Sequence, residues 1–148
     1  MYRHILIPTD GSELAHKAVT HGLSLAKSLG AKVSVVTVET PFHVFDVYRH
    51  NIDRLSTAMA EHNEHAKAHA SKILNIVADA AKAEGVPCET VQADGDQPYV
   101  AIISTAKDRG CDLIVMASHG RSGISALLLG SETNKVLAHS SGPVLVYR

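Results

Sequence analysis

Short runs of apolar and β-branched residues alternate along the chain with longer segments in which apolar residues recur at three- and four-residue steps. The short runs, which stop at glycine, proline or polar turn residues, predict strands. They cover residues 4–8, 32–38, 88–93, 113–116 and 143–147. The runs at 4–8 and 113–116 are almost entirely apolar, which is typical of parallel strands buried on both faces.

The segments with helical spacing predict helices that lay an apolar stripe on a sheet. They cover residues 13–29, 52–84, 98–107 and 131–139. Ser12 is the expected N-cap of the first helix and Gly30 its C′ residue, while Ser131 is the expected N-cap of the last. The second helix is long enough to outreach the sheet. Residues 42–51 lack a regular pattern, and both a loop and a short helix covering part of a binding site fit them.

Strands and helices alternate throughout the chain, and this order predicts a parallel sheet with helices on both faces and right-handed crossovers. A length of 148 residues suits one domain with a sizeable core. We therefore expect a single α/β domain over residues 1–148. Ligands of such sheets bind beyond the carboxyl ends of the strands, where the strand order reverses.

The composition of the chain limits the classes of partner and the cellular compartment that we expect. A formal net charge of −1 and a pI of about 6.8 provide no general field for nucleic acid or an anionic membrane. No run reaches the roughly 18 apolar residues of a membrane span, so we expect a cytoplasmic protein. Cys88 and Cys111 lack CxxC spacing and make no disulfide framework, which favours buried or idle thiols.

The stretch 112–131, DLIVMASHGRSGISALLLGS, carries the candidate chemistry. A predicted strand leads into a loop in which Gly120 and Gly123 are free to turn their amide hydrogens toward an anion. The following helix start offers free amides and partial positive charge to a phosphate. The same glycines could serve only turns and helix caps, and the flanking strand and helix favour the phosphate interpretation.

The spacing of this stretch resembles the nucleotide loop of the universal stress protein family, whose ATP-binding members carry G-x2-G-x9-G-S/T. The pattern falls on Ala117, Gly120, Gly130 and Ser131, so alanine replaces the first glycine. The resemblance extends from residues 5–10 to residues 143–146. It implies a five-stranded sheet of order 3-2-1-4-5 and a homodimer formed through the apolar edge strand Val144 to Tyr147.

The resemblance also implies an adenine nucleotide as the ligand, with ATP preferred over AMP or ADP and with Mg²⁺ as a candidate companion. The expected cofactor-binding residues are Pro8, Thr9, Asp10, Val38, Met116, Ala117, Gly120, Arg121, Gly130, Ser131, Glu132 and Thr133. Thr9 and Val38 would contribute backbone atoms. Asp10 fits a ribose, adenine or metal contact and equally an Asx turn. Arg121 fits a phosphate contact and equally a solvated loop, and Glu132 would repel a triphosphate unless its carboxylate pointed to solvent.

Several catalytic and metal sites fit the sequence poorly. There is no G-x4-G-K-S/T sequence and no G-x-S-x-G, and no set of residues for phosphoryl transfer can be nominated. His62, His65 and His69 share a helical face, but the surrounding charged residues favour solvent exposure over zinc binding. We expect nucleotide binding without rapid turnover. A nucleotide-free protein that acts through protein contacts and a slow ATPase are the alternatives.

Overall fold

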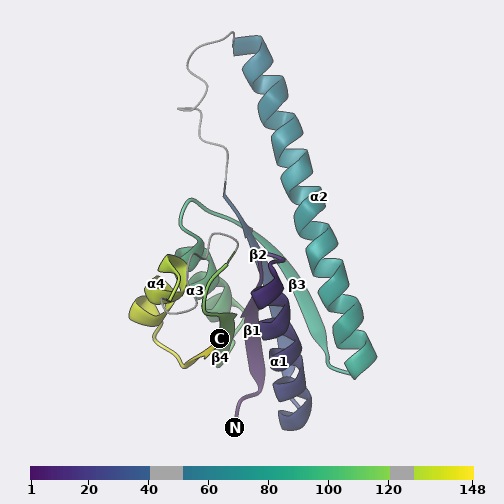
Figure 1. The fold of residues 1–148 in the computed structure, drawn as a ribbon, viewed down its shortest axis with the longest axis vertical. Helices are drawn as coiled ribbons and strands as arrows, with labels where there is room; N and C mark the ends of the chain where they lie inside the picture. The colour runs from purple at the N-terminus through teal and green to yellow at the C-terminus, as the bar shows by residue number, and fades with distance from the viewer. Residues whose placement is uncertain (41–51, 121–128) are drawn as a thin grey trace.

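The computed structural model describes residues 1–40, 52–120 and 129–148, and it alternates strands with helices (Figure 1). The elements are β1 (His4–Pro8), α1 (Glu13–Leu29), β2 (Lys32–Glu39), α2 (Ile52–Glu84), β3 (Cys88–Asp94), α3 (Pro98–Asp108), β4 (Leu113–Ala117), α4 (Ser131–His139) and β5 (Val144–Tyr147). The predicted elements are confirmed to within one residue at each end. The segment 42–51, for which a loop and a short helix both fitted, lies outside the described residues.

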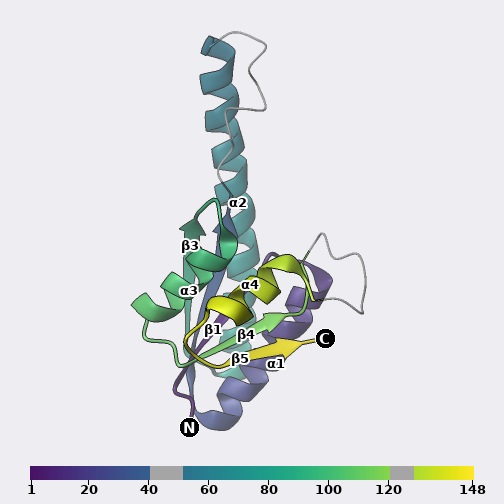
Figure 2. The same ribbon diagram turned by 90° about the vertical axis from the view of Figure 1, so that its left-hand side faces the viewer.

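The strands form one five-stranded parallel sheet of order β3-β2-β1-β4-β5, which confirms the expected fold. Helices α1 and α2 cover one face, and α3 and α4 cover the other (Figures 1 and 2). Alternate residues of β1 supply the two cores: Ile5 and Ile7 pack toward the first face, and Leu6 toward the second. All three are fully buried, as is expected for a central parallel strand.

Local signals fix the ends of α1 as predicted. The Ser12 side chain accepts a hydrogen bond from the Ala15 amide at 3.3 Å, which makes Ser12 the N-cap. Gly30 has a φ of 64°, in the left-handed region, and donates its N–H to the last carbonyls of the helix. These two caps set the length of the helix that follows β1.

The prediction that Ser131 caps α4 is wrong, because the N-cap is Gly130 and Ser131 is the first helical residue. The Asn134 amide donates to the Gly130 carbonyl at 3.0 Å, so the helix begins one residue earlier than the side chains suggest. A Cβ atom at position 130 would lie 3.1 Å from His119 Cα, so glycine fits this place better than serine.

Helix α2 extends well beyond the sheet, as its sequence predicts (Figure 1). Its buried side chains, among those described, belong to the half that follows residue 69: Ala70, Leu74, Val77 and Ala81. Ile76 is 52% exposed. In the described part of the chain, no helix is both long and apolar enough to cross a membrane.

Candidate functional site

The carboxyl ends of β1 and β4 form the point at which the strand order reverses. After β1 the chain enters α1 on one face of the sheet, and after β4 it leads to α4 on the other (Figure 2). The two loops meet here, since a Cβ built on Gly120 would lie 2.5 Å from Asp10 Oδ2. Two sequence segments about a hundred positions apart therefore form one corner, where ligands of such sheets bind.

Asp10 takes one of the two roles expected from its sequence position, an Asx turn. Its Oδ1 atom accepts a hydrogen bond from the Ser12 amide at 3.0 Å, which is an Asx turn at the start of α1. The other carboxylate oxygen lies against Gly120. Thr9 beside it is held by β2, because its N–H donates to the Val36 carbonyl at 2.9 Å and its carbonyl accepts from the Thr37 hydroxyl at 3.1 Å.

The main chain of Val38 faces the space beyond the end of β1. Residues of β2 bond alternately to its two neighbours: Val36 bonds toward β1, whereas Glu39 bonds toward β3 through its carbonyl. Val38 is two residues after Val36 and therefore points its N–H and C=O the same way. The β1–β2 register ends at Pro8 opposite Val36. The Val38 backbone groups therefore have no β1 residue opposite them in the register.

Hydrogen bonds hold both ends of the loop that follows β4. Ser118 donates its N–H to the Tyr147 carbonyl at 2.7 Å, and its own carbonyl accepts the Gly130 N–H at 2.7 Å. The Thr133 hydroxyl donates to the Ala117 carbonyl at 3.0 Å. These bonds place the first turn of α4 directly over the carboxyl end of β4.

Side chains of the expected binding residues near β4 are mostly buried. Met116, Ala117 and Thr133 are at most 8% exposed, so main-chain atoms are what this part of the site offers. The amides of Ser131 to Thr133 precede the first intrahelical bond, which Asn134 donates. They are the amides that a helix start leaves without an intrahelical acceptor. Arg121 lies outside the described residues.

Glu132 turns its carboxylate toward α3. Its Oε2 atom accepts the Tyr99 N–H at 2.9 Å, and its Oε1 atom lies 2.9 Å from Lys135 Nζ. The carboxylate charge is therefore compensated by a helix start and an ammonium group. The carboxylate is thus directed to α3 and Lys135 and not simply to solvent, as the sequence expectation required, and its compensated charge reduces the repulsion of a nearby phosphate.

A hollow of about 410 Å³ lies at the carboxyl end of β3, and sequence reasoning missed it. It is lined by Ala93, Asp94, Gly95, Asp96, Gln97, Val100, Ala101 and Ser104. Ala93 is the register partner of Val38, so the hollow adjoins the strand that faces the candidate site. The Gly95-Asp96-Gln97-Pro98 turn, at the same edge of the sheet as the two loops, was the available signal.

The model of the universal stress protein family matches residues 1–148. The chain belongs to the universal stress protein family. Universal stress protein YxiE of Bacillus subtilis is 35% identical to it, with 100% of each chain covered. Universal stress protein MJ0577 of Methanocaldococcus jannaschii is 30% identical, covering 100% of this chain and 96% of that protein.

Solved structures agree with this assignment. The structure of MJ0577 matches with a TM-score of 0.81 and 28% identity, over 99% of this chain and 95% of that one. A universal stress protein crystallised in complex with cAMP matches with a TM-score of 0.71 and 26% identity, over 99% and 97% of the two chains. The family suggested by the nucleotide loop is thus confirmed over the whole chain.

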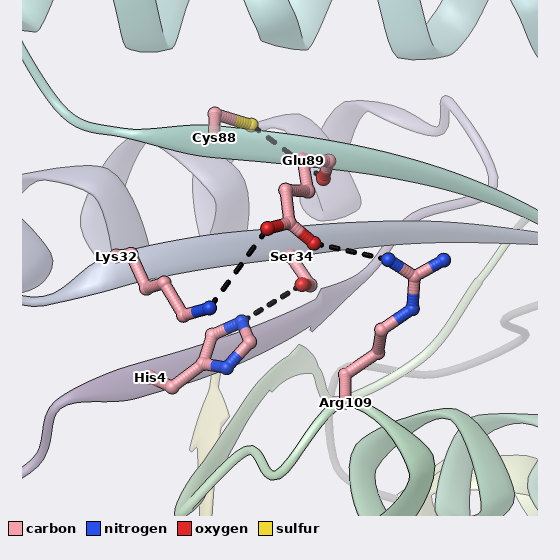
Figure 3. Close-up of polar contacts among 6 residues, drawn as sticks. All are labelled: His4, Lys32, Ser34, Cys88, Glu89 and Arg109. Carbon is pink, nitrogen blue, oxygen red and sulfur yellow. Dashed lines mark hydrogen bonds and ion pairs between the residues drawn. The ribbon is translucent and has the colours of Figure 1, made fainter.

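This universal stress protein has a second polar cluster at the opposite, amino edge of the sheet (Figure 3). Glu89 of β3 lies between Lys32 of β2, at 3.8 Å, and Arg109, at 3.0 Å. His4 of β1 shares a 2.8 Å hydrogen bond with Ser34. The cluster consists of paired groups, and among the described residues no group of three His, Cys, Asp or Glu side chains could hold a metal ion. We assign it a structural role.

Both cysteines of this universal stress protein are free thiols on partly buried positions. Burial raises the pKa of Cys111 to about 11, although the Ser34 hydrogen bond acts in the opposite direction. Burial, followed by the Glu89 charge, also raises the pKa of Cys88. The thiolate is the reactive form, so both groups are expected to be unreactive near neutral pH, in line with the interpretation as idle thiols.

The buried His4 gives a prediction for the pH dependence of stability. Burial, and then the charge of Lys32, lower the pKa of His4 below its ordinary 6.5, against the opposite effects of Glu89 and Asp112. The unfolded chain therefore takes up the proton first, and the free energy of unfolding should fall as pH drops below about 6.5 and through the lowered pKa. Urea unfolding at pH 7.5 and 5.5 measures the change.

Two variants isolate the contribution of His4. His4→Gln should show a smaller loss of stability between the two pH values, because glutamine takes up no proton. His16→Gln, which alters an exposed histidine of α1, should keep the wild-type difference. An equal loss of stability in His4→Gln and wild type would show that His4 is not the responsible group.

Proposed function

We propose that this universal stress protein is a regulatory module that binds an adenine nucleotide, preferably ATP, at the carboxyl edge of its sheet. One observation carries the proposal: the first turn of α4 is pinned over the end of β4, with the amides of Ser131 to Thr133 beside the corner where Asp10 meets Gly120. Helix starts of this kind bind phosphate through main-chain N–H groups. The relative crystallised with cAMP supports the same class of ligand.

The base and ribose fit on the β2 side of this corner. The backbone of Val38 offers one donor and one acceptor facing the space past β1, and these are the groups that an adenine edge can pair with. The hollow beside Ala93 measures about 410 Å³, within the usual range of roughly 300–1,000 Å³ for small-molecule sites. Asp10 lies between the two regions, within reach of a ribose or of a phosphate-bound Mg²⁺.

Binding without rapid turnover fits the residues better than efficient hydrolysis. The sequence has no Walker A lysine, and main-chain amides stabilise bound phosphate without activating a water molecule.

The departure at Ala117, where the family pattern has glycine, favours a second candidate, a nucleotide-free protein that acts through protein contacts. The extra methyl group is small, and Ala117 as a whole is only 8% exposed, so the replacement changes little of the surface that a ligand could contact.

Calorimetry of the full chain with ATP, AMP, cAMP and adenosine, each with and without Mg²⁺, tests the proposal. We expect saturable binding of ATP and weaker binding of adenosine. Absorbance of a heat extract of the purified protein would show copurified nucleotide. Absence of binding by every ligand at millimolar concentration would overturn the proposal and leave the nucleotide-free candidate.

We also propose that two copies pair through β5, which lies at one edge of the sheet. The amides of Ile114 in β4 and of Ser118 just after it donate to the Pro143 and Tyr147 carbonyls. By alternation, Val144 and Val146 direct their main-chain groups outward. An apolar strand edge of this kind is usually covered.

Val146→Pro removes one outward N–H and should give a monomer in light scattering at micromolar concentration. Val146→Thr keeps that N–H and should stay dimeric, whereas a monomeric wild-type protein would refute the pairing.

A further inference from the structure

The N-terminus of α3 is capped by a residue from a different helix. Gln97 occupies the N-cap position but makes no side-chain capping bond. Tyr99 is the second residue of α3, so its N–H has no intrahelical acceptor. Glu132 of α4 supplies that acceptor at a distance of 2.9 Å. One carboxylate in the first turn of α4 thus also serves the first turn of α3.

The same face of α4 makes further contacts with the start of α3. Lys135 Nζ lies 5.6 Å from the centroid of the Tyr99 ring and 2.9 Å from Glu132 Oε1. The His139 ring lies 5.2 Å from the Tyr99 ring. Because residues three and four positions apart share a helix face, these side chains form one seam between α3 and α4.

The first turn of α4 is therefore held in two directions. Thr133 ties it to β4 through the Ala117 carbonyl at 3.0 Å, and Glu132 ties it to α3. Gly130 and Thr133 both hold the turn at the carboxyl end of β4, and the Glu132 bond adds a hold from α3 in a different direction, which limits rotation of the turn about the end of β4. The direction of the amides of Ser131 to Thr133 depends on this rotation.

We propose that Glu132 is a positioning residue for the nucleotide site, which by capping α3 holds the first turn of α4 so that its amides face a phosphate group. The inference rests on the proposed nucleotide-binding function. It assigns Glu132 a role through Tyr99 rather than through direct contact with the ligand. The opposite expectation follows from charge alone, because removing a carboxylate near a polyanion should strengthen binding.

Three variants separate these two effects, with ATP and adenosine as ligands in calorimetry. Glu132→Ala removes the bond to Tyr99 and should weaken ATP binding about tenfold, on the scale of a lost charge-assisted hydrogen bond. Its affinity for adenosine, which has no phosphate, should change by less than about twofold. Glu132→Gln keeps an acceptor oxygen for the Tyr99 N–H and should bind ATP within about threefold of wild type.

Glu13→Ala is the matched control, since Glu13 is also in the first turn of a helix but its ion pair, with Lys17, stays within that helix. It should leave both affinities unchanged. Equal or tighter ATP binding by Glu132→Ala would overturn the positioning role while leaving the nucleotide site intact. Absence of ATP binding by the wild-type protein would instead overturn the proposed function itself, and the positioning role with it. An equal loss for ATP and adenosine would show general damage to the fold and would also contradict the proposal.

Discussion

Gly130→Val is expected to abolish measurable ATP binding by this protein, with a loss of affinity of at least about 100-fold, or roughly 2.7 kcal/mol. A Cβ at this position would lie 3.1 Å from His119 Cα and 3.3 Å from both His119 Cβ and the Ser118 carbonyl oxygen. Valine adds two further methyl groups to this crowded place. The junction between β4 and α4 must then move, and the bond from the Gly130 amide to Ser118 would be strained or lost.

The direction of that Cβ shows how the loss of ATP affinity would arise. The substituted side chain would point into the His119 backbone, so it displaces the first turn of α4 rather than standing where a phosphate would bind. We also expect some loss of folding stability, about 1–3 kcal/mol, as is usual for overpacked sites. Calorimetry with ATP and urea unfolding, carried out on the same preparation, measure the two effects.

Gly142→Val is the matched control for this experiment. A Cβ at position 142 would meet nothing within 4 Å, and the residue is exposed between α4 and β5. The same substitution there should leave ATP affinity and stability close to wild type. Wild-type affinity in Gly130→Val would show that the phosphates bind elsewhere and that the site at the start of α4 is misplaced.

Leu6→Ala should have the largest effect on stability, lowering the free energy of unfolding by about 2–5 kcal/mol. Leu6 is fully buried at the centre of the sheet. It packs in the cluster with Val36, Ile114 and Val136, which joins three strands to α4. Truncation would leave a cavity that these neighbours, fixed by the strand ladders, cannot readily fill. The shift in the urea midpoint at constant slope measures the loss.

The comparison for Leu6 is Leu29→Ala at the end of α1, where the leucine is 39% exposed. That variant should lose less than about 1 kcal/mol, because much of its side chain already contacts water. Comparable losses in both variants would mean that the packing around Leu6 relaxes after truncation, contrary to the rigid core inferred from the sheet.

Hydrophobic periodicity was sufficient to predict the strands and helices, but it did not decide where β2 and β3 end. β2 continues to Glu39 and β3 to Asp94, because these two residues pair in register and the Gly95 amide closes the ladder on the Glu39 carbonyl at 3.1 Å. Such polar ends depend on a partner strand rather than on side-chain hydropathy. The order of the strands came from the family resemblance, and periodicity alone would not have supplied it.

The strand order implied by the family resemblance brings the loops after β1 and β4 together, but the sequence did not reveal the contacts that hold them. Glu132 and Tyr99 are 33 positions apart and belong to different helices, and no spacing rule links such a pair. The choice of Gly130 over Ser131 as the cap depends on the room left by His119. These features arise from tertiary packing, which a local pattern cannot encode.

The two halves of the continuous helix α2 are expected to exchange their amide hydrogens at different rates, because one half projects beyond the sheet. Amides after residue 69 belong to turns anchored by buried side chains such as Leu74 and Val77, so their exchange requires the core to open. The described turns before residue 69 bury no side chain, and an isolated helical stretch of that length is only marginally stable in water. Deuterium should therefore enter those earlier turns by local fraying, and labelling rates should change sharply near Ala70 although the helix itself is unbroken.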